Sequence, residues 1–185
     1  NNEVQYAEVL NVLRRYPRIK VIFAHFFFLS GQLERLSGYL DEFPNMHVDL
    51  TPGIEMYENF ARDSQKARDF FLKYQDRILF GTDIGAMALL HAPGTPIDPI
   101  DSKIRVDLVR SFLEQEGPLK MDVNPDQAYL FGKFASGFQA IHLPDEALEK
   151  IYHKNFERLA GNTPRPVNPR AISAECRRLS AIIPA

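Results

Sequence analysis

The chain has 185 residues, of which 45% are apolar. Its 22 Lys and Arg residues and 24 Asp and Glu residues give a net charge of −2. These values are typical of one soluble globular domain. The charge excludes a basic field for nucleic acid, and no apolar run approaches the roughly 18 residues of a membrane span, so we expect neither nucleic acid nor membrane as a partner. A single cysteine, Cys176, excludes an internal disulfide, and without a visible secretion signal we expect a cytoplasmic protein.

Helical and strand patterns alternate along the first 112 residues. Apolar stripes at helical spacing fall at residues 6–13, 33–43, 67–74 and 104–112. Short runs typical of strands fall at residues 21–24, 46–50 and 78–80. The first of these runs is wholly apolar, which is typical of a strand buried on both faces. This alternation predicts an α/β fold whose parallel strands are joined by right-handed crossovers.

The remaining segments carry weaker patterns. A proline-rich loop is expected at residues 85–101, and a helix at residues 144–159 with Gly161 as its stop. A proline-rich linker follows, and a last short helix is expected at residues 170–182.

Each predicted strand ends in an ionisable residue: His25, Asp49 and Asp83. Ligands of parallel α/β folds bind outside the carboxyl ends of the strands, where an ionisable group must be paired, bound to metal or wet. His25 could bind a metal or transfer a proton, or simply bond a backbone carbonyl. Asp83 could bind a metal and accept a proton, or cap its own turn. Asp49 could orient a ligand, although a purely structural role in its loop is favoured.

The other polar candidates are weaker. His47 lies on the same strand face as Asp49, and packing is favoured there. His91 lies in the proline-rich loop, where it could reach a substrate or remain solvated. Arg105 and Arg110 are expected on a solvated helix face. The motifs HxH, HExxH, GxSxG, GxGxxG and GxxxxGK[ST] are absent, which argues against serine hydrolases, dinucleotide enzymes and nucleotide hydrolases.

The order of these segments resembles the amidohydrolase-related family, in the branch that includes aminocarboxymuconate-semialdehyde decarboxylase and the resorcylate decarboxylases. Residues 16–25, 45–51 and 77–83, the last ending in Gly81-Thr82-Asp83, are similar to the family's sixth, seventh and eighth strands. Residues 143–159 resemble its closing helix.

The resemblance implies a partial (β/α)8 TIM barrel, strands 6 to 8 with the following helices, over residues 1–161, and a linker with a terminal helix over residues 162–185. It implies that Asp83 is a metal ligand and proton acceptor, and that His25 contacts substrate or moves a proton. One divalent ion, zinc by expectation, would serve hydrolysis of a C–O or C–N bond, as in a lactone, or nonoxidative decarboxylation of a small carboxylate. The expected partner is the amino-terminal half of the barrel, so this chain alone should have an incomplete metal site and no activity; a homodimer is left open.

One departure from the family concerns Phe26, Phe27 and Phe28, which stand where the family often has glycine or small residues. The three rings could form an apolar wall that contacts substrate, or fill a gap in the core. Two other functions therefore stay open: a barrel protein that has lost its chemistry, and a small α/β domain that binds a partner without metal.

Overall fold

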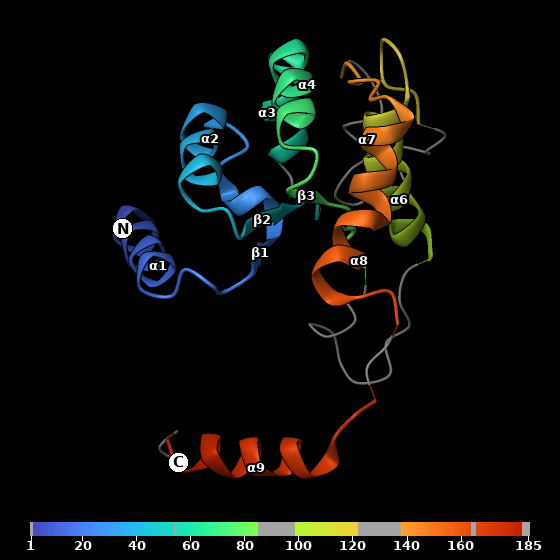
Figure 1. The fold of residues 1–185 in the computed structure, drawn as a ribbon. Coiled ribbons are helices and arrows are strands. Elements are labelled where there is room, and N and C mark those ends of the chain that lie inside the picture. Colours follow the sequence, from blue (N-terminus) through green and yellow to red (C-terminus); the bar gives the residue numbers. More distant parts are fainter. Residues whose placement is uncertain (1, 54, 85–98, 122–137, 164–165, 183–185) are drawn as a thin grey trace.

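The computed structural model describes residues 2–53, 55–84, 99–121, 138–163 and 166–182 (Figure 1). In chain order its elements are α1 (Asn2–Arg15), β1 (Val21–Phe23), η1 (Ala24–Phe28), α2 (Leu33–Glu42), β2 (Met46–Asp49), α3 (Met56–Ala61), α4 (Ser64–Lys73), β3 (Ile78–Leu79), α6 (Pro99–Glu114), α7 (Asp145–Glu149), η3 (Lys150–Lys154), α8 (Asn155–Ala160) and α9 (Pro169–Ser180).

The strands form one parallel sheet in the order β1-β2-β3, which confirms the predicted parallel α/β arrangement. In the register, Ile22 lies opposite His47, and Asp49 lies opposite Leu79. Figure 1 shows α1 and α2 on one side of the strands, with α6, α7 and α8 on the other. The short helix α3, which no apolar stripe predicts, lies beside α4.

The core joins one face of the sheet to the helices through aromatic rings. Met46, Val48 and Ile78 are buried on this face. Above them, Phe60 of α3 stacks on Phe112 of α6, with ring centroids 5.6 Å apart. The helices that follow β2 and β3 are thereby packed against each other as well as against the strands.

The strand β1 differs from its prediction, because it is not buried on both faces. Ile22 is 41% exposed, and Val21 and Phe23 are only partly buried. Val21 donates its N–H to Asn45 O of the β2 side, at 3.1 Å. Alternation in a parallel ladder then directs the N–H and C=O of Ile22 to the opposite side, where the described part of the chain places no strand. Periodicity reports the character of the side chains, not whether a neighbouring strand is present.

The outer edge of β3, in contrast, is covered by a helix. Phe80 donates its N–H to Ile151 O at 2.9 Å, and the side-chain amide of Asn155 donates to Ile78 O at 2.8 Å and to Gln75 O at 2.7 Å. Ile151 lies in η3, a π-helical turn, where the wider turn frees a carbonyl for an outside donor. The helix α7–η3–α8 therefore satisfies backbone groups that a neighbouring strand would otherwise bond.

The arginine that precedes β3 fastens the amino ends of two strands. Arg77 donates from Nε to Met46 O at 2.8 Å and from Nη2 to Phe43 O at 2.5 Å. These bonds explain a cation at the start of an apolar strand, since they satisfy two carbonyls where β2 begins.

The helix α9 stands apart from the rest of the chain, and all of its residues are exposed (Figure 1). Among the helices in the described ranges, none combines the length and the apolar character needed to cross a membrane.

Candidate functional site

The carboxyl ends of β1 and β2 are tied together by one carboxylate. Oδ1 of Asp49 accepts the backbone N–H of His25 and the backbone N–H of Thr51, each at 3.1 Å. His25 lies in η1, two residues after the end of β1, and Asp49 is the last residue of β2. The carboxylate thus fixes the backbone from which the His25 ring extends.

The ring of His25 is held in one tautomer. Its Nδ1 lies 3.1 Å from Thr51 O. A carbonyl oxygen can only accept, so Nδ1 carries the proton, and in the neutral ring Nε2 keeps its lone pair. His25 is therefore set up to act through Nε2 as a base, as an acid once protonated, or as a donor to an anion.

The residues from His25 to Phe28 form a left-handed turn. Their φ angles lie between 53° and 56°, a conformation that glycine adopts freely and that costs other residues roughly 1–2 kcal/mol each. The family pattern of glycine or small residues fits this conformation. Four bulky residues hold it here, so packing must offset the strain.

Phe26 and Phe27 provide that packing. Phe26 is fully buried, with its ring 5.0 Å from that of Phe60 and 5.6 Å from that of Phe71. Phe27 stacks on Phe23, with ring centroids 4.1 Å apart. Burial of each ring contributes about 1.5–3 kcal/mol, which matches the strain of the residues concerned. These two rings therefore serve the core, the second of the two roles that the sequence left open.

Phe28 is placed differently, because its ring is 64% exposed. Its centroid lies 5.2 Å from that of the His25 ring, at an interplanar angle of 32°. A groove of about 530 Å³ between α1 and the β1–η1 segment is lined in part by Phe23, Ala24 and Phe28, and the mostly buried Phe27 also contributes to its wall. Of the three phenylalanines, only Phe28 lies on the surface beside the imidazole.

The end of β3 approaches the same carboxylate. A Cβ added to Gly81 would lie 2.6 Å from Thr51 Oγ1, 3.1 Å from Thr51 N and 3.4 Å from Asp49 Cγ. Glycine is thus required here by close approach of two strand ends. The contact connects the His25–Asp49–Thr51 network to the segment that carries Asp83.

We expect Gly81→Ala to lower the free energy of unfolding by about 1–3 kcal/mol, because the methyl group overlaps the Thr51 hydroxyl and also presses on the Thr51 backbone nitrogen. The matched control is Gly38→Ala in α2, where nothing lies within 4 Å of an added Cβ, and which should stabilise by about 0.5–1 kcal/mol. Urea unfolding of both variants measures the difference; equal stabilities would contradict the close approach.

Asp83 is paired with an arginine that the sequence placed on a solvated surface. Arg105 of α6 is only 3% exposed, and its Nη1 lies 3.5 Å from Asp83 Oδ2. The expectation of a solvated Arg105 is therefore wrong, whereas Arg110 does lie on the exposed side of α6. Asp83 itself has a φ of +57°, and its side chain is 34% exposed. The sequence does not distinguish Arg105 from a solvated arginine, because it lies next to Ile104 at the edge of the apolar stripe and is not itself apolar.

His47 is packed, as its strand position favoured. It is 2% exposed, and its Nδ1 lies 3.1 Å from Asn45 O. Its buried Nε2 contacts no hydrogen-bond partner in the part of the chain that the structure describes. Burial lowers the pKa of His47, and the nearby cations Arg77 and Arg158 lower it further.

This pKa predicts a pH effect on stability. Below about pH 6.5 the unfolded chain takes up a proton at His47 that the folded chain resists. As the pH is lowered, this group therefore reduces the free energy of unfolding by at most about 1.4 kcal/mol per pH unit. His47→Gln should flatten the decline between pH 6.5 and 5, whereas exposed His153→Gln should not. Chemical unfolding at several pH values measures it; parallel curves for His47→Gln and the original protein would contradict it.

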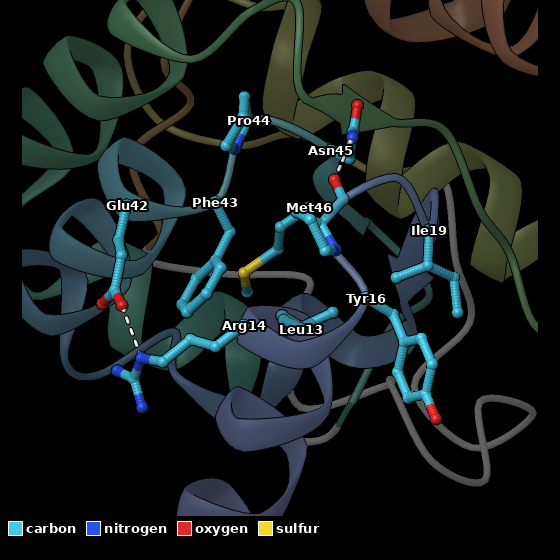
Figure 2. A pocket seen from close by; sticks show the side chains of 10 residues that line it. Leu13, Arg14, Tyr16, Ile19, Glu42, Phe43, Pro44, Asn45 and Met46 are labelled. Atoms are coloured by element: carbon cyan, nitrogen blue, oxygen red, sulfur yellow. Dashed lines mark hydrogen bonds and ion pairs between the residues drawn. The ribbon is translucent and has the colours of Figure 1, made fainter.

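A second pocket lies at the opposite, amino-terminal end of β2 (Figure 2). It has a volume of about 230 Å³, and Leu13, Phe43 and Met46 form its apolar part. At its rim, Arg14 Nε lies 2.8 Å from Glu42 Oε1 (Figure 2). The pocket is remote from the strand ends that carry His25 and Asp49, so it adds nothing to the candidate chemistry.

A metal ion does not fit the described residues by themselves. Within these ranges, no three His, Cys, Asp or Glu side chains gather closely enough to hold one. Asp49 is already bonded to two backbone donors, and Asp83 is paired with Arg105. His91, the remaining sequence candidate, lies outside the described residues.

Comparison with known proteins identifies the family of the chain. The sequence profile of the family described as Amidohydrolase matches residues 3–161. No curated protein and no solved structure matches the chain significantly. The profile covers most of the chain, and the chain therefore belongs to the amidohydrolase family.

Proposed function

We propose that this chain is part of a hydrolase or nonoxidative decarboxylase that acts on a small carboxylate substrate, and that residues at the carboxyl ends of its strands belong to the active site. The observation that carries the proposal is the hydrogen bond from His25 Nδ1 to Thr51 O, which leaves Nε2 with a lone pair at the carboxyl end of a parallel strand. His25 would transfer a proton through Nε2 or bind a substrate anion. Asp83 would accept a proton, and Asp49 would orient His25 through its backbone.

We infer further that the whole enzyme depends on one divalent ion, zinc by preference, with Asp83 among its ligands. Its other ligands would come from residues beyond those described here. Of the three phenylalanines, Phe28 is the one that is exposed beside His25, and therefore the one that lies at the proposed site. His91 remains a candidate for substrate contact, and the cytoplasm remains the proposed compartment.

The partner that best suits the sheet is the amino-terminal half of a (β/α)8 barrel, with residues 1–161 as strands 6 to 8. The open side of β1, with the backbone groups of Ile22 directed away from β2, supports this proposal. An added parallel strand would bond these groups and cover the exposed Ile22 side chain. The aminocarboxymuconate-semialdehyde decarboxylase branch is the proposed relative within the family.

The metal content of the longest natural polypeptide that contains this chain tests the proposal. In metal-replete buffer we expect one divalent ion per polypeptide, and loss of that ion in Asp83→Asn. Asp76→Asn, an exposed carboxylate at the other end of β3, should retain it. Absence of metal, or metal that is kept in Asp83→Asn, would contradict the assignment.

One observation favours a second candidate, a barrel protein without chemistry. Bulky residues occupy all four left-handed positions of the turn that contains His25, and nothing in their strain requires catalysis. This candidate predicts no turnover of lactones or aromatic carboxylates by the metal-replete polypeptide.

A further inference from the structure

Phe28 is out of place by the usual rules of stability. Its ring is 64% exposed, so it gains little from burial, and its φ of +56° strains any residue except glycine. Phe26 and Phe27 share the strained turn but are anchored in the core. Within the described part of the chain, Phe28 therefore has little packing to offset its strain, and strained residues of this kind cluster at functional sites.

The one aromatic contact of Phe28 recorded among the described residues is with His25. The two ring centroids are 5.2 Å apart and the planes are inclined by 32°, so the two rings are neighbours in a tilted arrangement. The hydrogen bond from Nδ1 to Thr51 O restrains the imidazole at a single point. A single hydrogen bond leaves the ring plane free to tilt, and a neighbouring ring limits that tilt.

We propose that Phe28 is a positioning residue, which holds the imidazole plane of His25 so that Nε2 keeps a fixed direction. The left-handed turn makes this contact, because it brings the side chain of the third residue after His25 back onto the imidazole. The strained backbone conformation of Phe28 thus serves to orient the His25 ring. The catalytic consequence rests on the proposed function, whereas the geometry does not.

Nuclear magnetic resonance of the His25 ring protons tests the geometry. The ring current of a neighbouring phenyl ring shifts these protons, so Phe28→Leu should move their signals, whereas Phe28→Tyr should leave them near their original positions. His25→Gln assigns the signals by their disappearance. Phe156→Leu, which removes another exposed ring, is the matched control and should move nothing. Unchanged His25 signals in Phe28→Leu would overturn the proposal.

Stability and turnover separate positioning from structural and substrate-contact roles. Phe28→Gly should be at least as stable as the original protein, since it relieves the left-handed strain, yet it should show the same signal movement as Phe28→Leu. In the longest natural polypeptide, Phe28→Leu should lower kcat about tenfold or more with little change in KM, and Phe28→Tyr should restore kcat. A change in KM alone would overturn positioning in favour of substrate contact. Turnover absent from every variant, with the signal movement present, would contradict the proposed function and leave the positioning geometry supported.

Discussion

Replacement of Asn155 by alanine is expected to lower the free energy of unfolding by about 2–4 kcal/mol. Asn155 is 2% exposed, and its amide donates to Ile78 O and to Gln75 O. Each carbonyl that loses its donor in a buried place costs about 1–3 kcal/mol. Because these bonds hold α8 to the edge of β3, their loss should also loosen the contact between Phe80 N–H and Ile151 O.

The midpoint and slope of urea unfolding measure this effect. Asn155→Asp keeps the shape of the side chain but removes its donor, so it should destabilise at least as much. Asn11→Ala, in the exposed part of α1, is the matched control and should stay within about 0.5 kcal/mol of the original protein. If the Asn155→Ala protein were as stable as the Asn11→Ala control, the bonds from α8 would not stabilise the edge of β3.

Replacement of Arg105 by methionine is expected to cost about 2–4 kcal/mol. The guanidinium is buried, and its removal leaves Asp83 without this cation. Loss of one partner from a fully buried pair costs about 3–5 kcal/mol, and the lower range applies because the Asp83 side chain is 34% exposed and can take up water.

Arg110→Met is the matched control, five residues further along α6. Its ion pair with Glu114 is largely exposed, and such pairs contribute about 0.2–1 kcal/mol. If Arg105 acts through Asp83, the double variant Arg105→Met with Asp83→Asn should lose less than the sum of the two single losses. Strictly additive losses in urea unfolding would show that the two side chains are not coupled.

The alternation of elements could be predicted because it depends on local patterns. The stripes that end before Pro17 and Pro44, and the runs at 46–50 and 78–80, report burial of nearby side chains. Parallel pairing then follows from the helices between the strands. An ionisable residue after an apolar run also stands out in the sequence, but only Asp49 ends a strand in the structure: His25 follows β1 by two residues and Asp83 follows β3 by four.

What could not be predicted depends on contacts between distant segments. Arg105 is buried and lies beside Asp83, which is 22 residues earlier in the chain, and no periodicity carries that information. The π-helical turn at Lys150–Lys154 is set by the edge of β3 that it covers. The left-handed turn contradicts the local preference of phenylalanine, so a sequence pattern argues against it. The family resemblance pointed to this segment as unusual, but only the backbone angles show how the rings are divided between core and surface.

The most direct test of the account is turnover of lactones and aromatic carboxylates by the longest natural polypeptide that contains this chain, with His25→Gln, Asp83→Asn and the double variant. If both side chains serve one reaction, each single variant should lose at least about 100-fold in kcat, and the double variant should lose little more than the worse single one. An original protein without turnover, a single variant with full turnover, or losses that multiply in the double variant would contradict a shared active site.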